Sequence, residues 1–332
     1  MIVFDLRWSG DHGIGRVSRM LDERLRLSHL SISGKPSSPL DPLRLLIAML
    51  KLPKDYAVFS PGYNAPLFVV RPFIFTILDL NHIDRPENSS FLKRMYYHYV
   101  MRRAAHNAFK VLTISEFSRQ RIIDWAGIDP FRVVNVGCGV DSQYTPNGTS
   151  FAADFPYLLC VSNRKAHKNE PRVIAAFAKA NISTDIRLLF TGNISDHMYL
   201  LCQQLGVEKR VVFLGRFPEQ DLPGLYRGAL ALLFPSLYEG FGLPVVEAMA
   251  CGTPVLTSNV TSLPEVAGDA ALLVDPISID EITRAIEKLC NDRELRKVLA
   301  SKGLIQAAKF SWDDVAARVK VVLDELSAGG PK

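Results

Sequence analysis

Residues 236–254 read Ser-Leu-Tyr-Glu-Gly-Phe-Gly-Leu-Pro-Val-Val-Glu-Ala-Met-Ala-Cys-Gly-Thr-Pro, and this stretch decides the fold. The apolar run 229–234 before it predicts a strand that breaks at Pro235. Pro244 suits the first turn of a helix, where its missing N–H costs nothing, so we expect a helix to begin there. The turn would then point backbone amides and the positive end of the helix dipole at a ligand, which favours phosphate. Its ligand-binding residues would be Gly240, Phe241, Gly242 and Leu243.

Two carboxylates bracket this turn. Glu239 stands beside the predicted phosphate site, and Glu247 lies about one turn into the predicted helix. Carboxylates repel a phosphate but accept hydrogen bonds from hydroxyls, which a sugar offers. One Glu for a hexose and one for a ribose would make a nucleotide-sugar site. The alternative is a capped core helix with two solvated glutamates.

The segment resembles the Glu-x7-Glu signature of the retaining glycosyltransferases called family 4. The resemblance continues through Ala250-Cys-Gly-Thr-Pro-Val-Leu-Thr257, Ser262-Leu-Pro-Glu-Val-Ala-Gly-Asp-Ala-Ala-Leu-Leu-Val-Asp-Pro276 and Phe310-Ser-Trp312. It implies the α/β arrangement called GT-B, in which two Rossmann-like domains face one another across a cleft. The last helix of this fold crosses back to the first domain.

Short apolar runs alternate with amphipathic stretches along the chain, which is typical of βα units and parallel sheets. The predicted strands lie at 2–6, 30–32, 56–59, 73–78, 111–114, 133–136, 157–161, 186–190, 211–214, 230–234, 254–256 and 271–274. The predicted helices cover 14–26, 42–49, 90–109, 116–125 and almost all of 279–326. The turn-rich segment 137–150 predicts a linker. We therefore expect an acceptor-side domain at 1–150, a donor-binding domain at 151–310, and a final helix at 311–327.

The composition indicates a globular protein. Hydrophobic residues make up 48% of the 332 and charged residues 22%, and no apolar run approaches the roughly 18 residues that a membrane span needs. Met1 leads directly into the first predicted strand without a basic leader, so we expect a cytoplasmic protein. The five cysteines lack metal-ligand spacing and are expected to be reduced.

Positive charge is concentrated in the first half of the chain. Residues 1–150 hold 19 Lys and Arg against 13 Asp and Glu, whereas the remainder holds 20 against 21. A basic half indicates nucleic acid, an anionic membrane or an anionic substrate as partner, and the chain has no nucleic-acid-binding motif. The basic, aromatic stretch 91–109 could lie on an anionic membrane at the inner face, or bury its aromatic stripe, which the pattern favours. The sequence leaves the oligomeric state open.

A basic loop follows the first strand of the predicted second domain, Ser162-Asn-Arg-Lys-Ala-His-Lys-Asn169. Arg offers a fork of donors and Lys a point charge, and both suit a diphosphate. The resemblance implies that one Arg and one Lys of this loop contact the donor diphosphate, and Arg164 and Lys168 match best. Lys165 or Asn163 could take the Arg role, and Ser162 would lie beside the donor. A solvated basic loop is the alternative.

Three further residue groups belong to the predicted site. The turn after the first strand contains Gly13 and Gly15, and the resemblance implies that such glycines lie under the donor phosphates and sugar. A tight turn without a ligand would explain them equally well. At the end of the strand 73–78, Asp79 could hold an acceptor hydroxyl or orient a loop. Family members often carry His immediately before this Asp; Leu78 stands there instead, and His82 is a candidate substitute.

The predicted reaction moves a hexosyl unit from a nucleotide diphosphate sugar to an acceptor hydroxyl with retention of configuration. The chain has no Asp-x-Asp pair, so we expect neither a metal nor another cofactor. The pattern looks most like bacterial mannosyltransferases of polysaccharide or lipopolysaccharide assembly, which suggests GDP-mannose ahead of UDP-, ADP- or dTDP-linked sugars. The acceptor would be a glycan or lipid-linked glycan that contacts loops such as 33–39 and 60–66. A sugar-nucleotide epimerase and an inactive nucleotide-sugar-binding subunit are the alternatives.

Overall fold

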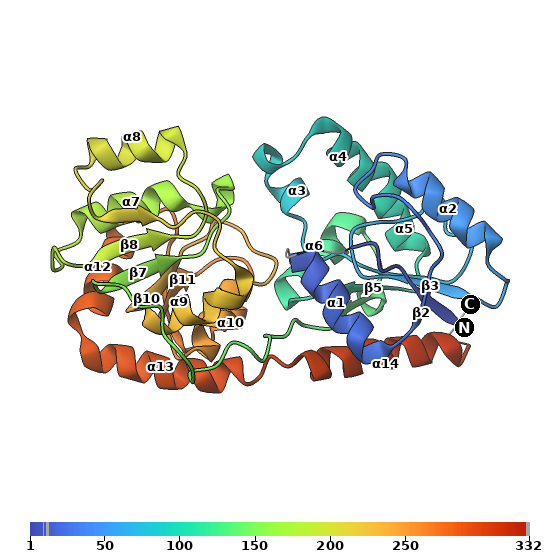
Figure 1. Ribbon diagram of the computed structural model, residues 1–332. Helices are drawn as coiled ribbons and strands as arrows, with labels where there is room; N and C mark the ends of the chain where they lie inside the picture. Colours follow the sequence, from blue (N-terminus) through green and yellow to red (C-terminus); the bar gives the residue numbers. More distant parts are fainter. Residues whose placement is uncertain (9, 11–12, 330–332) are drawn as a thin grey trace. The chain divides into compact units, whose positions relative to one another are not determined.

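The computed structural model describes residues 1–8, 10 and 13–329. Its internal contacts divide the chain into two compact units, which are Met1–Gly139 with Ser311–Lys332 and Val140–Phe310 (Figure 1). The second unit thus begins inside the segment 137–150 that the sequence indicates as a linker. Each unit contains one six-stranded sheet. That the two domains face one another across a cleft stays a prediction.

The sheet of the first unit is parallel throughout and has the order β2-β1-β3-β4-β5-β6. Its strands are β1 (Ile2–Phe4), β2 (Ser28–His29), β3 (Ala57–Ser60), β4 (Phe73–Thr76), β5 (Lys110–Thr113) and β6 (Val133–Asn135). This is the flavodoxin-like order, whose direction reverses between β1 and β3. The strand predicted at 30–32 was wrong in position, because the edge strand β2 begins two residues earlier.

Helices of the first unit flank this sheet. They are α1 (Gly13–Leu25), α2 (Asp41–Lys51), α3 (Asn81–Asp84), α4 (Phe91–Tyr96), α5 (Arg102–Asn107), α6 (Glu116–Ala126) and α14 (Trp312–Ser327), with short 3-10 turns η1 (Pro86–Asn88) and η3 (Pro130–Arg132). A π-helical turn, η2 (Tyr97–Met101), joins α4 to α5, so the predicted helix 90–109 exists with a widened turn in its middle. The prediction that this stretch buries its aromatics is right for Tyr97, which is 2% exposed, and wrong for Phe91 and Tyr99, which are exposed.

The C-terminal helix α14 packs on the first unit, as the sequence predicted, and contacts α1. Arg24 on α1 forms an ion pair with Asp313 at 2.7 Å, and Arg318 donates a hydrogen bond of 3.0 Å to the Val136 carbonyl. The Trp312 indole lies so close to Gly139 that a Cβ on this glycine would come within 2.6 Å of the ring. The chain therefore returns from the second unit to complete the first.

The sheet of the second unit is also parallel, with the order β12-β11-β10-β7-β8-β9. Its strands are β7 (Tyr157–Cys160), β8 (Arg187–Phe190), β9 (Val211–Phe213), β10 (Ala231–Phe234), β11 (Val255–Ser258) and β12 (Ala271–Val274). This is the Rossmann order, and its switch point lies between β7 and β10. Side chains of both strands are buried, as expected for strands covered on both faces.

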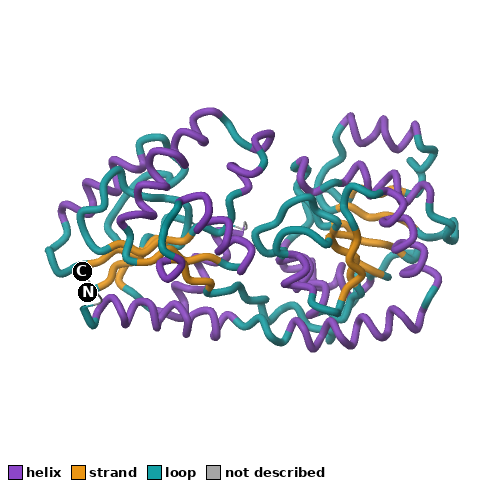
Figure 2. Tube along the Cα trace, turned by 180° about the vertical axis from the view of Figure 1, so that it is seen from behind, coloured by secondary structure: helices purple, strands orange, loops and turns teal. Residues whose placement is uncertain are grey.

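The helices of the second unit follow the expected alternation with strands. They are α7 (Glu170–Lys179), α8 (Asp196–Gln204), α9 (Leu222–Gly228), α10 (Leu243–Ala250), α11 (Leu263–Ala267), α12 (Ile279–Asn291) and α13 (Arg293–Ala307), with 3-10 turns η4 (Ala166–Lys168) and η5 (Glu219–Asp221). Figure 2 shows that the strands of each unit form a layer with helices around it. Across the described residues, no helix combines the length and the apolar character needed to cross a bilayer.

Candidate active site

The predicted site residues of the second unit gather at the switch point of its sheet. The loop after β7 carries Ser162–Lys168, and the loop after β10 carries Ser236–Glu239. The two strands are adjacent and parallel, with Leu158 paired to Ala231, so both loops leave the same edge. Ligands of doubly wound sheets bind outside the carboxyl ends of the strands at this point. The sheet therefore brings together two motifs that are distant in sequence.

An ion pair joins the two motifs. The Lys168 Nζ lies 2.7 Å from Glu239 Oε1, and each of these side chains is only 13% exposed. The same Nζ lies 4.8 Å from the centre of the Phe234 ring, at the end of β10. Limited solvent exposure makes such a pair stronger than an ordinary surface pair. A ligand that contacts both side chains must accept hydrogen bonds from the Lys168 ammonium and donate hydrogen bonds from hydroxyls to the Glu239 carboxylate. Its acceptor group and its hydroxyls must therefore lie side by side.

The turn into α10 is held from behind by Ser262. Its hydroxyl lies 3.0 Å from the carbonyl oxygens of both Glu239 and Phe241 and can donate to either. Gly242 caps the helix at φ +109°, and a Cβ there would lie 2.6 Å from Leu263 Cδ2, so the position requires glycine. Gly240 and Phe241 are buried, and the helix begins at Leu243, one residue before the predicted start at Pro244. The helix start is thus a fixed feature of the switch point.

Glu247 lies in the interior of the second unit, at 3% exposure. Its Oε2 accepts a hydrogen bond of 2.7 Å from the Tyr226 hydroxyl on α9. Burial raises the pKa of Tyr226 well above its usual value, and the nearby charge of Glu247 adds to this shift. The contact of Glu247 with a ribose stays a prediction. Sequence reasoning missed Tyr226, because no local motif marks a partner on another helix.

Arg164 holds the ends of three strands together. Its side chain forms an ion pair with Glu170, which is 4% exposed, at the start of α7. Its guanidinium also donates to the carbonyls that follow β8, at 2.8 Å to Asn193 and 2.6 Å to Thr191. The group lies about equally far from two rings on β8 and β9, Phe190 and Phe213. These contacts occupy the guanidinium within the protein, and its contact with a diphosphate stays a prediction.

The rest of the basic loop differs in exposure. Asn163 and Lys165 are exposed, whereas the Ser162 hydroxyl is buried and finds no hydrogen-bond partner among the described residues. The Ser236 hydroxyl, in the loop after β10, is likewise buried without a hydrogen-bond partner among the described residues. Buried hydroxyls without a partner are uncommon in native proteins. Both switch-point loops thus carry a polar atom that nothing in the described structure satisfies.

Asn169 is a further residue that the sequence did not single out. Its side-chain amide donates to the carbonyls of Pro235, at 2.9 Å, and Pro276, at 2.6 Å. Its backbone is left-handed at φ +62°, a conformation that Asn tolerates better than most residues. Asn169 therefore fixes the loop after β10 against the start of α7.

In the first unit, Asp79 and His82 are both held by neighbours. The Asp79 backbone N–H donates to the Tyr63 hydroxyl at 3.0 Å, and its Oδ1 accepts from the Asn81 N–H at 3.0 Å. The His82 Nδ1 lies 2.8 Å from the Asn88 carbonyl, and its Nε2 lies 3.2 Å from Lys93 Nζ. The roles of Asp79 and His82 toward a substrate stay predictions.

The two predicted glycines have different surroundings. A Cβ on Gly15 would lie 2.2 Å from the Gly10 carbonyl oxygen, so the turn requires glycine at this position. Among the described residues, none has an atom within 4 Å of a Cβ on Gly13, the first residue of α1. Packing against these residues therefore does not require glycine at 13. Ser9, Asp11 and His12 of the predicted glycine turn lie outside the described residues.

Comparison with known proteins decides the family. The family model described as "Glycosyl transferases group 1" matches residues 144–306. The O-antigen chain mannosyltransferase B of Escherichia coli is 33% identical over 277 residues, which cover 79% of this chain and 72% of that protein. The chain belongs to the group 1 glycosyltransferases. The region matched by the family model lies within the second unit of this glycosyltransferase and includes both switch-point loops.

Another relative agrees with this assignment, and solved structures show the fold. The MMP alpha-(1->4)-mannosyltransferase of Mycolicibacterium hassiacum is 31% identical over 247 residues, with 71% of this chain and 59% of that protein covered. The chain spans only 27% of the serotype-specific mannosyltransferase WbdA of E. coli. Sucrose-phosphate synthase of Thermosynechococcus elongatus superposes with a TM-score of 0.79 at 18% identity over 99% of both chains. These findings and the two parallel sheets show the GT-B fold.

We predict that Tyr226→Phe destabilises the glycosyltransferase. The change removes only the hydroxyl and leaves the buried Glu247 Oε2 without this donor, at a cost of about 1–3 kcal/mol in the free energy of unfolding. Urea unfolding followed by circular dichroism measures the difference. Tyr199→Phe is the matched control, because Tyr199 is 49% exposed and should change the value by less than about 0.5 kcal/mol. Equal effects of the two changes would contradict the assigned role of Tyr226.

Proposed function

We propose that this glycosyltransferase moves a mannosyl unit from GDP-mannose to a hydroxyl of a glycan or lipid-linked glycan, with retention, in polysaccharide or lipopolysaccharide biosynthesis. The observation that carries the proposal is the contact between Lys168 and Glu239 at the switch point, beside the start of α10. The names of the E. coli and M. hassiacum relatives support mannose as the transferred sugar. The solved Anabaena HepE, which has the same fold, is in complex with UDP and glucose.

In the proposed reaction, the paired side chains contact adjacent parts of the donor. Glu239 accepts hydrogen bonds from hydroxyls of the sugar, and Lys168 stabilises charge on the leaving diphosphate, together with amides at the start of α10. Glu247 contacts the ribose. The bond from the anomeric carbon to the diphosphate oxygen breaks as the bond to the acceptor oxygen forms on the same face. A donor phosphate oxygen takes the acceptor proton, as is proposed for the family.

The second basic contact to the diphosphate falls to Lys165 in this proposal. Arg164 already pairs with Glu170 and donates to carbonyls, whereas Lys165 is exposed in the same loop. Arg164 then acts indirectly, by holding the loop against the ends of β8 and β9. From the first unit, Gly13 and Gly15 border the donor, and Asp79 and His82 contribute to sugar or acceptor contacts.

We predict that Glu239→Gln lowers kcat/KM for transfer at least about 100-fold, because the variant keeps the shape but loses the charged acceptor of the sugar hydroxyls. Mannosyl transfer from GDP-mannose to a synthetic oligomannoside with a hydrophobic aglycone measures this. Glu294→Ala, which removes an exposed carboxylate on α13, is the control and should leave the rate unchanged. Near-normal turnover of Glu239→Gln would refute the proposed site.

The same assay separates the alternatives. Conversion of the donor into an isomeric sugar nucleotide without acceptor would indicate an epimerase. Tight donor binding without transfer would indicate a binding subunit. A thermal-shift panel of GDP-, UDP-, ADP- and dTDP-linked sugars identifies the donor, because a ligand that binds only the folded protein raises its stability.

We expect transfer to proceed without a divalent ion, since basic side chains and amides stabilise the negative charge of the diphosphate that such an ion would otherwise neutralise. Among the described residues, no group of three or more His, Cys, Asp or Glu side chains is arranged to hold a metal ion. The rate in excess EDTA, compared with the rate in added Mg²⁺ or Mn²⁺, tests this expectation. A rate that vanishes with EDTA and returns with metal would contradict it.

We further propose that the first unit associates with an anionic membrane. Phe91 and Leu92 on α4 are 66% and 71% exposed, and the next two residues are Lys93 and Arg94. On α2, the exposed Leu43, Ile47 and Leu50 share one helical face. Exposed apolar side chains beside basic ones are the composition of interfacial segments.

Flotation with vesicles tests this association. The protein should float with vesicles that contain anionic phosphatidylglycerol and should stay in solution with phosphatidylcholine alone, because the basic residues require an anionic surface. The double variant Phe91→Ser/Leu92→Ser should float several-fold less. Phe131→Ser, which removes an even more exposed ring before β6, serves as the control. If the protein does not float even with vesicles that contain phosphatidylglycerol, the proposal is refuted.

A further inference from the structure

The strand β12 forms one edge of the second sheet, with β11 as its neighbour. The Asn259 N–H donates to the Val274 carbonyl at 2.9 Å, so Val274 directs its backbone groups toward β11. Alternate residues of a strand in a parallel ladder direct their N–H and C=O groups to the same side. Leu272 therefore also faces β11, whereas Leu273 directs its N–H and its carbonyl away from the sheet. An edge with such groups is a template for pairing with another chain.

Nothing on β12 itself protects this edge. Its four residues are all apolar, whereas many edge strands carry a lysine or a proline that discourages pairing. Leu272 and Val274 pack against the core on the side of α12, and Leu273 lies on the opposite face, 40% exposed. The edge strand β6 of the first unit differs, because Arg119 donates to its Val133 carbonyl at 2.8 Å. Outside its own sheet, the backbone of Leu273 forms no hydrogen bond with any described residue.

A groove lies between this edge and α12. Its volume is about 180 Å³, and its walls are the strand residues 272–274 and four residues of α12, which are Glu281, Arg284, Ala285 and Lys288. Arg284 and Lys288 are exposed and lie about one turn apart on the helix. The groove thus combines an open strand edge on one side with a charged helix on the other.

The charges that line the groove are mainly positive. Glu281 accepts a hydrogen bond of 2.9 Å from the Asp275 N–H, directly after the end of β12. The side chains of Arg284 and Lys288, in contrast, form no ion pair or hydrogen bond within the part of the chain that the structure describes. A ligand of this groove therefore gains from negative charge that it places beside α12.

The spacing of the two cations fits an extended peptide. Four residues separate them on the helix, which corresponds to about 6 Å along its axis. Residues at alternate positions of a strand point to the same face and lie about 6.6–6.8 Å apart. In a strand added to β12, two acidic side chains at alternate positions would thus each meet one cation. The residues between them would lie on the face of Leu273, where apolar side chains fit.

We propose that the edge of β12 binds an extended segment of a partner protein in which acidic and apolar residues alternate. The segment adds to the sheet as an antiparallel strand, and its backbone exchanges hydrogen bonds with the N–H and the carbonyl of Leu273. Its acidic side chains pair with Arg284 and Lys288, and its apolar side chains cover Leu273. A nucleic acid or a lipid headgroup would satisfy the cations but would not pair with the strand edge, so the groove favours a peptide.

Binding of a labelled synthetic peptide, followed by fluorescence anisotropy, tests the charge pairing. A peptide of about eight residues with alternating glutamate and valine should bind at least about tenfold more tightly than one with lysine in place of glutamate. Arg284→Ala/Lys288→Ala should weaken binding of the acidic peptide at least about tenfold. Lys51→Ala/Lys54→Ala, which removes two exposed cations of the first unit, is the matched control and should change the affinity less than about twofold.

Methylated peptides test the backbone pairing. The valine residues of the peptide lie opposite Leu273, so methylation of their backbone nitrogens removes the donors to its carbonyl and should weaken binding about tenfold or more. Methylation of the glutamate nitrogens, which point away from β12, is the control and should leave binding within about threefold. If both methylated peptides bind as tightly as the parent peptide, the groove is a surface for anions only and the strand pairing is wrong.

Three further outcomes would overturn the proposal. One is the absence of measurable binding of the acidic peptide at millimolar concentration. Another is equal binding by the wild type and Arg284→Ala/Lys288→Ala. The third is a wild-type dimer in sedimentation velocity that this double variant dissociates, since a second copy of the chain would then occupy the groove. The double variant should transfer sugar at the wild-type rate, because both residues lie outside the proposed active site, so a failure of this inference leaves the proposed function unaffected.

Discussion

The parallel pairing of β7 with β10 determines where the chemistry of this chain takes place. These strands are neighbours in space although two strands and three helices separate them in sequence, and their adjacency places Lys168 2.7 Å from Glu239. The turn into α10, with Gly242 against Leu263 and the Ser262 hydroxyl behind it, depends on the same edge. Without this pairing, the basic loop and the two-carboxylate motif would be unrelated segments.

Local signals in the sequence predicted the features that depend on local structure. Pro244 indicated a helix start, and the structure begins α10 one residue earlier, at Leu243, because a proline tolerates the first turn and the glycine at 242 tolerates φ +109°. Nearly all strands were predicted for a similar reason, since buried parallel strands are short apolar runs. The edge strand β2 was misplaced because its residues Ser28 and His29 are exposed and lack such a pattern.

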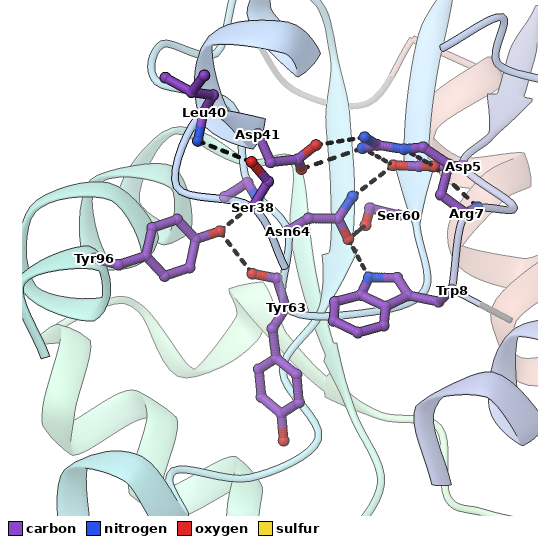
Figure 3. Close-up of polar contacts among 11 residues, drawn as sticks. Asp5, Arg7, Trp8, Ser38, Leu40, Asp41, Ser60, Tyr63, Asn64 and Tyr96 are labelled. Carbon is purple, nitrogen blue, oxygen red and sulfur yellow. Dashed lines mark hydrogen bonds and ion pairs between the residues drawn. The ribbon is translucent and has the colours of Figure 1, made fainter. Parts of the chain in front are cut away.

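Features that depend on long-range contacts could not be predicted. Besides Glu170, the partners of Arg164 are backbone carbonyls after β8, which carry no sequence signature. Tyr226 reaches Glu247 from another helix, and nothing around either residue indicates the pair. The polar network around Arg7 (Figure 3) requires three loops whose approach follows only from the strand order β2-β1-β3. Sequence identified the candidate residues, and the sheet topology determined which of them touch.

The two switch points differ in how their charges are exposed, and this difference separates their roles. In the second unit, Lys168 and Glu239 retain 13% exposure, so a ligand can replace part of their mutual contact with contacts of its own. In the first unit, Asp5 and Asp41 are almost fully buried and form ion pairs with Arg7. Separating either carboxylate from Arg7 would leave uncompensated charge in the interior. A polar substrate can therefore compete for the contacts of Lys168 and Glu239, but not for the contacts of Asp5 and Asp41 with Arg7.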